Sequence, residues 1–123
     1  MLSRNNEGVT LLRTYIEAAS AIGKGFAVAT SGDAKASASG EIKGISAKSH
    51  EAGDEVLLFP TNEVRPVIIG ATLTSGTKLT SDADGKLVEA TAAGDVVVAI
   101  AMEGGDDTDE ILAWIVNPYE LGV

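Results

Sequence analysis

The chain contains no cysteine, so neither disulfide bonds nor thiolate metal sites can contribute to its structure or chemistry. Aromatic residues are also scarce, because only Tyr15, Phe26, Phe59, Trp114 and Tyr119 are present. The core is therefore expected to consist of valine, isoleucine, leucine and alanine. A thin aliphatic core of this kind favours self-association, because contact between copies buries additional apolar surface.

Lys and Arg are also few relative to Asp and Glu, and the excess of negative charge is unevenly distributed along the chain. Residues 1–61 carry six Lys/Arg against seven Asp/Glu, whereas residues 62–123 carry three against eleven, which gives −1 and −8 of the total −9. Because phosphate binding needs clustered positive charge, no nucleic-acid partner is expected. Charged residues interrupt the N-terminal apolar residues, so neither a signal peptide nor a membrane span of about 20 residues is expected.

Short strands are predicted from residue 23 onward. β-Branched and aliphatic runs alternate with Gly, Asp, Asn, Ser and Pro at intervals of about ten residues, a spacing typical of an all-β protein. We expect a small β-barrel or sandwich of about eight short strands, forming one domain over residues 23–123. The expected strands are residues 26–30, 41–46, 55–59, 67–69, 78–81, 87–90, 96–102 and 111–116.

Residues 1–22 differ from this pattern. Their apolar residues mix roughly helical spacing with polar interruptions, which predicts either a short helix or an N-terminal arm that lies on another subunit. The residues expected to make that contact are Val9, Leu11, Leu12, Tyr15 and Ile16.

The best-defined local unit is a hairpin around Asp82-Ala83-Asp84-Gly85, where turn-forming residues separate two β-prone runs. Gly85 suits a positive φ angle at this tip. The same residues share features with the start of a calcium-binding loop, but the glycine comes too early and the required acidic residue is missing. A hairpin turn is therefore the favoured interpretation.

The sequence also contains a faint internal repeat. Residues 44–59 align without gaps with residues 99–114, and four pairs are identical: Ile45 with Ile100, Asp54 with Asp109, Glu55 with Glu110, and Leu57 with Leu112. Upstream, Gly25-Phe26-Ala27-Val28 loosely matches Gly76-Thr77-Lys78-Leu79. Two related β-units and a chance match of small residues both remain open at this point.

Few residues are candidates for chemistry. Residues 106–110 gather four carboxylates in a loop led by glycines, which is typical of an exposed acidic turn, although metal binding or docking of a basic partner is an alternative. His50, the single histidine, lies in a polar stretch and is expected at the surface. The sequence Gly23-Lys24-Gly25-Phe26 lacks the remainder of a dinucleotide fingerprint. No catalytic residue, metal site or cofactor is therefore predicted.

The run that contains Trp114 is a candidate for contact with other subunits. Ile111-Leu112-Ala113-Trp114-Ile115-Val116 would be apolar on both faces of a strand, and such strands are buried on both sides, within the domain or against a neighbouring subunit. Trp114 and Tyr119 are therefore candidate residues of the core or of an oligomer interface.

Residues 70–102 resemble the small capsid decoration, or cement, proteins of tailed bacteriophages. The motif residues are Gly70, Leu73, Gly76 and Leu79, the hairpin from Asp82 to Gly85, the turn from Ala92 to Asp95, and the strand from Ala99 to Ala101. The resemblance implies a trimer on the outside of the virion head, made in the host cytoplasm. There it would bind the major capsid protein at threefold or quasi-threefold positions and stabilise the shell, without enzymatic activity.

Two other functions compete with this expectation. A ligand- or glycan-binding β module of a phage tail or fibre would use the same fold, but sugar sites favour aromatic platforms and aromatic residues are few here. A trimeric β enzyme of nucleotide metabolism would need a phosphate-binding motif, which the sequence lacks.

Overall fold

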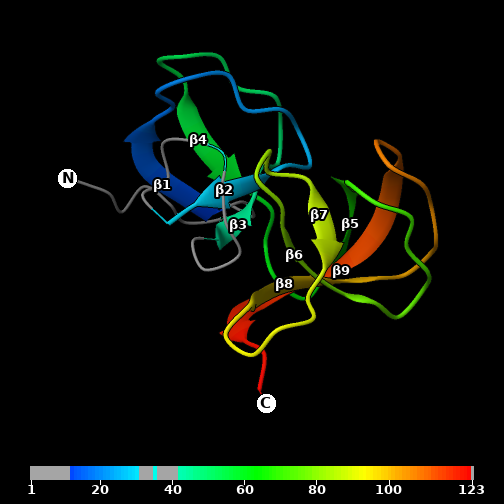
Figure 1. The fold of residues 1–123 in the computed structure, drawn as a ribbon. Coiled ribbons are helices and arrows are strands. Elements are labelled where there is room, and N and C mark those ends of the chain that lie inside the picture. Colours follow the sequence, from blue (N-terminus) through cyan, green and yellow to red (C-terminus); the bar gives the residue numbers. More distant parts are fainter. Residues whose placement is uncertain (1–11, 31–34, 36–41, 123) are drawn as a thin grey trace.

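The computed structural model describes residues 12–30, 35 and 42–122, and within these ranges the chain is all-β (Figure 1). The strands are β1 (Leu12–Glu17), β2 (Ala27–Ala29), β3 (Ile42–Ile45), β4 (Glu55–Leu58), β5 (Val64–Ile68), β6 (Lys78–Ser81), β7 (Leu87–Glu89), β8 (Val96–Ala101) and β9 (Glu110–Glu120). The described ranges contain no helix, and therefore none that could cross a membrane.

All strand pairs in the three sheets are antiparallel. β5, β9, β8, β6 and β7 form a five-stranded sheet in that order, while β1 pairs with β4 and β2 pairs with β3. A bridge between Ser46 and Leu58 joins β3 to β4. The first four strands therefore follow the order β1-β4-β3-β2, which matches β5-β9-β8-β6. Figure 1 shows these two groups as two lobes, which we call the first repeat (residues 12–59) and the second repeat (residues 64–120).

The two repeats share backbone hydrogen bonds at corresponding positions. The Gly25 N–H donates to the Ser46 carbonyl (2.9 Å) in the first repeat, as the Gly76 N–H donates to the Ala101 carbonyl (2.7 Å) in the second. In the same way, the Ser46 N–H donates to Phe26 O (2.9 Å) and the Ala101 N–H to Thr77 O (2.8 Å). The third pair is Ala47 N–H to Leu57 O (2.9 Å) and Met102 N–H to Leu112 O (2.9 Å). The spacing is the one by which the sequence aligns with itself. The structure therefore confirms the internal repeat, and a chance match no longer explains it.

The loops repeat as well as the strands. In the first repeat the N–H of Glu51 donates to Asp54 Oδ2 at 2.8 Å, and in the second the N–H of Asp106 donates to Asp109 Oδ2 at 2.8 Å. The residue before each aspartate has a positive φ, 95° at Gly53 and 73° at Thr108. Matching loops indicate that the repeat extends over whole strand-loop-strand units.

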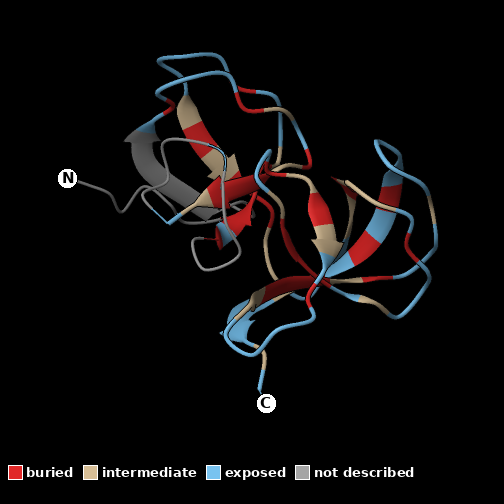
Figure 2. Ribbon diagram, viewed as in Figure 1, coloured by how far each residue is buried: buried red, intermediate tan, exposed pale blue. Residues whose placement is uncertain are grey.

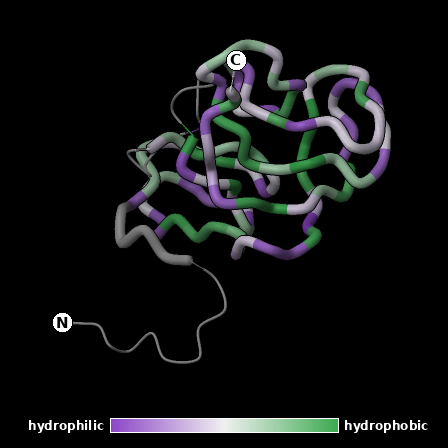
Figure 3. Tube along the Cα trace, turned by 90° about the horizontal axis from the view of Figure 1, so that it is seen from below, coloured by the Kyte–Doolittle hydropathy of each residue, from purple (hydrophilic) through white to green (hydrophobic). Residues whose placement is uncertain are grey.

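The apolar core has two parts. The smaller cluster lies within the first repeat and consists of Ala18, Ile22, Val28, Val56 and Leu58. The larger cluster fills the second repeat and also includes Ala27, Ile42, Ile45 and Phe59 of the first. Buried segments accordingly concentrate where the two lobes meet (Figure 2), and hydrophobic stretches follow the strands while hydrophilic ones lie mainly in loops (Figure 3). One face of the first repeat is thus covered by the second.

His50 is buried, at 2% exposure, so the expectation of a surface histidine is wrong. Its Nε2 accepts a hydrogen bond from the Leu57 N–H at 3.2 Å. Gly105 occupies the corresponding position in the second repeat, where an added Cβ would lie 2.7 Å from Ile111. The imidazole fits in the first repeat because the residue corresponding to Ile111 is the smaller Val56.

The expected fold class is confirmed, and each of the eight predicted strands is present, all but β6 with shifted ends. The alternative of a helix within residues 1–22 is wrong for residues 12–17, which form β1 and pair with β4. Pro66 lies inside β5. It is tolerated there because β5 is an edge strand of its sheet, where the missing N–H need not join a ladder.

Candidate interaction surface

The side chains of β9 alternate between buried and exposed along its first half, as the colours of Figure 2 show. Ile111, Ala113 and Ile115 face the core, whereas Leu112 and Trp114 are 45% and 40% exposed. The apolar run that the sequence predicted to be buried on both sides is therefore covered on one side only within this chain. The interpretation of Trp114 as a core residue is wrong.

Neighbouring strands extend this exposed side into an apolar surface. Trp114 pairs with Val64 of β5 on one side and with Ile100 of β8 on the other, so the three side chains point to the same face of the sheet. Leu112 pairs with Pro66, and the Met102 N–H donates to the Leu112 carbonyl at 2.9 Å. We call this surface the outer face: Val64, Pro66, Ile100, Met102, Leu112 and Trp114.

The outer face collects most of the large exposed hydrophobic side chains. Within the described ranges there are five such residues, and Val64, Met102, Leu112 and Trp114 belong to the outer face. The fifth, Tyr119, pairs with Val97 nearer the far end of β9. Scattered single hydrophobic residues are normal on a protein surface, but a contiguous group marks an interaction site. Tryptophan and methionine are enriched at such contacts.

Charged side chains border the outer face on β6 and β9. Lys78 continues the row of Trp114 and Ile100 onto β6 and is exposed. On β9, Glu110 alternates with Leu112 and Trp114 on the exposed side of the strand and is itself exposed. An apolar centre bordered by charged groups is the arrangement expected for a contact between proteins.

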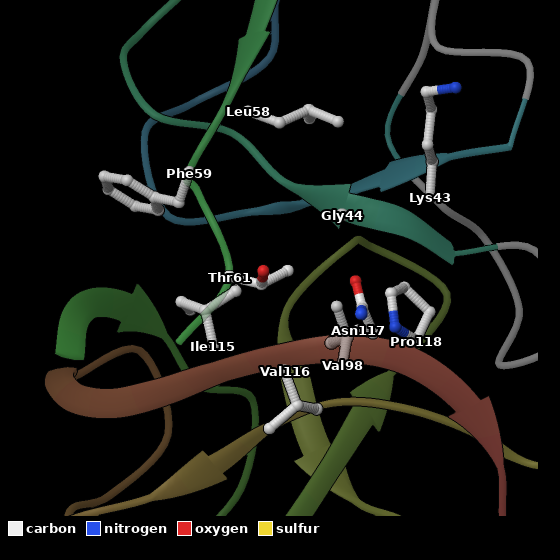
Figure 4. Close-up of a pocket in the computed structure, with 10 residues that line it drawn as sticks. All are labelled: Lys43, Gly44, Leu58, Phe59, Thr61, Val98, Ile115, Val116, Asn117 and Pro118. Atoms are coloured by element: carbon white, nitrogen blue, oxygen red, sulfur yellow. The ribbon is translucent and has the colours of Figure 1, made fainter. Parts of the chain in front are cut away.

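A cavity of about 310 Å³ lies where the two repeats meet (Figure 4). It is lined by Lys43, Gly44, Leu58, Phe59 and Thr61 from one side and by Val98, Ile115, Val116, Asn117 and Pro118 from the other. Its lining is largely apolar, and its volume is at the small end of the range for ligand pockets. The cavity therefore marks the junction between the repeats.

The two acidic motifs both form turns. Asp82 Oδ1 accepts hydrogen bonds from the N–H groups of Asp84 (2.8 Å) and Lys86 (3.0 Å), and Gly85 has a φ of 80°, so the predicted hairpin is confirmed. Residues 106–110 are exposed, and Lys86 lies 3.8 Å from Asp107. Within the described residues, no group of three potential metal-binding side chains comes together.

The predicted contact residues lie in different places. Trp114 is on the outer face and Tyr119 lies further along β9, whereas Leu12, Tyr15 and Ile16 belong to β1. Val9 and Leu11 are outside the described residues. Sequence reasoning did not identify Val64, Met102 and Leu112 as exposed, or Ile100 as part of the same face. The alternate positions of Leu112 and Trp114 along one strand were a signal that both lie on one face.

Comparison with known proteins finds a likeness among solved structures. No protein-family model matches the chain, and no curated protein matches it. Among solved structures, the fold is similar to a crystal structure described as the head fiber gp8.5 N base in bacteriophage phi29. The two agree with a TM-score of 0.69 and 20% sequence identity, over 92% of this chain and 99% of the other. The likeness shows that the two chains share a fold over almost their whole lengths.

Proposed function

We propose that this chain is a structural protein of a phage head that works by binding other protein subunits. The observation that carries the proposal is the shared fold with the phi29 head fiber base, which covers almost all of both chains. Because fold alone does not determine function, the outer face provides the second support. An exposed apolar surface bordered by charge is expected of a protein that assembles with others.

The finer proposal is that the protein binds the outer surface of the head as an oligomer, a trimer at threefold or quasi-threefold positions, and stabilises the shell. The major capsid protein would be its partner there. Many identical sites on a lattice can each bind modestly and still give high occupancy, because an oligomer engages several of them together. The predicted contacts are Trp114, Tyr119 and the N-terminal residues Val9, Leu11, Leu12, Tyr15 and Ile16.

Purified heads that lack this protein provide the test. We expect the full chain to co-sediment with them to saturation and to raise the temperature at which they release DNA. A chain without residues 1–11, which keeps all of β1, should bind with lower occupancy. No sedimentation with heads at any concentration, from a chain shown to be folded, would refute the proposal.

A further inference from the structure

The outer face has a counterpart in the first repeat, and that counterpart is buried. The row Lys78, Ile100 and Trp114 on β6, β8 and β9 corresponds to Ala27, Ile45 and Phe59 in the first repeat. These three residues are between 0% and 5% exposed and belong to the larger core cluster. This row is thus covered in one repeat and open in the other, while Leu57 and Ala47, which correspond to Leu112 and Met102, are half-buried.

The cover on the first repeat comes from the second repeat. β3 packs against β8 and β9, and the Ile68 N–H of β5 donates to the Gly25 carbonyl at 3.0 Å. The guanidinium carbon of Arg65 lies 5.7 Å from the centroid of the Phe59 ring, within the range of a cation–π contact. The first repeat therefore packs the face that contains Phe59 against the second repeat, which follows it in the chain. Arg65 of the second repeat lies over the Phe59 ring.

We propose that the outer face of the second repeat binds the first repeat of a second copy of this chain. Trp114 takes the position of Phe59, and Ile100 takes that of Ile45, so two of the three side chains in the row are matched at the open face, while Lys78 takes the position of Ala27. A second copy of the chain is thus the partner of the outer face. This inference rests on the proposed function only because that function makes the outer face an assembly surface.

Charge selects the first repeat of the next copy over its second repeat. Residues 62–123 carry −8 and residues 1–61 carry −1, so a face-to-face contact of two second repeats would bring the two strongly acidic halves together. A head-to-tail contact brings the acidic half beside exposed lysines of the first repeat, which include Lys24, Lys43 and Lys48. A head-to-tail contact joins two different surfaces, so copies form a ring where the rotation between them closes and a filament where it does not.

Mass measurement on matched variants tests the contact. We expect light scattering to give a mass of several copies for the wild-type chain, and Trp114→Ser and Leu112→Ser to raise the concentration of half-dissociation at least tenfold. Glu120→Ser is the matched control, because Glu120 is also exposed on β9 but lies off the outer face, and it should keep the wild-type mass. All three side chains are exposed, so the urea midpoints of the dilute variants should stay near that of the wild type.

Cross-linking tests the orientation of the contact. In an equal mixture of unlabelled and isotope-labelled chains, an amine cross-linker should join Lys78 of one copy to Lys24, Lys43 or Lys48 of another. Links between copies that join only Lys78 to Lys78 would overturn the head-to-tail contact. A wild-type chain that stays monomeric, or outer-face variants that keep its full mass, would overturn the inference even if the chain binds heads. An oligomer that does not bind heads would support the inference and refute the proposed function.

Discussion

In the second repeat, other residues fill the core position that His50 occupies in the first repeat. Introducing those residues into the first repeat should restore the stability that a substitution of His50 removes. His50 Nε2 accepts the Leu57 N–H at 3.2 Å, while in the second repeat Glu103 Oε2 accepts the corresponding Leu112 N–H at 2.9 Å. Gly105 takes the position of His50, and Ile69 and Ile111 fill the space that an imidazole would need. The matching residues in the first repeat are Lys48, Ala18 and Val56.

The expected energies follow from these contacts. His50→Gly leaves the Leu57 N–H without its acceptor, at about 1–3 kcal/mol. The lost ring leaves a cavity, so the total should be about 4 kcal/mol, near the values for removing large core side chains. Ala18→Ile and Val56→Ile together add four carbons, which return about 3 kcal/mol at roughly 0.8 kcal/mol for each buried carbon. Lys48→Glu supplies a carboxylate acceptor and returns about 1 kcal/mol.

Urea unfolding of the two variants and the wild type measures these differences. The chain with all four substitutions should lie within about 1 kcal/mol of the wild type, with a similar dependence on urea concentration. Lys48→Glu alone is the control and should change little, because Lys48 is exposed. If the fourfold variant is no more stable than His50→Gly, the two cores are not equivalent and the reasoning from the repeat is refuted.

Two further predictions use corresponding positions. Phe59→Ala should lower the free energy of unfolding by about 3–5 kcal/mol, because Phe59 is buried between the repeats. Trp114→Ala in the dilute monomer should lower it by only about 1 kcal/mol. Equal losses in calorimetry would contradict the conclusion that Phe59 is buried and Trp114 exposed. Thr108→Gly should stabilise the chain by up to about 1 kcal/mol, because a β-branched residue at a φ of 73° is strained and the matching residue is Gly53. A lower midpoint for Thr108→Gly in chemical unfolding would count against that strain.

Much of the strand pattern could be predicted from the sequence because turn residues separate its β-prone runs. β6 (Lys78–Ser81) was predicted with both ends correct, and the hairpin after it followed from Gly85. β1 was missed for a physical reason. Its pairing with β4 shifts register between Arg13 and Glu17, and such an irregularity breaks the alternation by which a strand is recognised.

Burial was harder to predict than strand position, because it depends on residues far apart in the chain. His50 lies among polar neighbours in sequence, but small residues at Ala18 and Val56 make room for it in the core. Trp114 and Phe59 occupy matching positions on similar strands. Only the packing of one repeat on the other decides that Phe59 is buried and Trp114 exposed.

The fluorescence of Trp114 tests the central claim most directly, since it is the only tryptophan in the chain and it lies on the outer face. As the chain passes from dilute solution to its assembled form, the emission should move to shorter wavelength and quenching by acrylamide should fall. Emission and quenching that stay the same in the monomer, in the oligomer and on heads would show that the outer face remains in water, and would contradict its role in assembly.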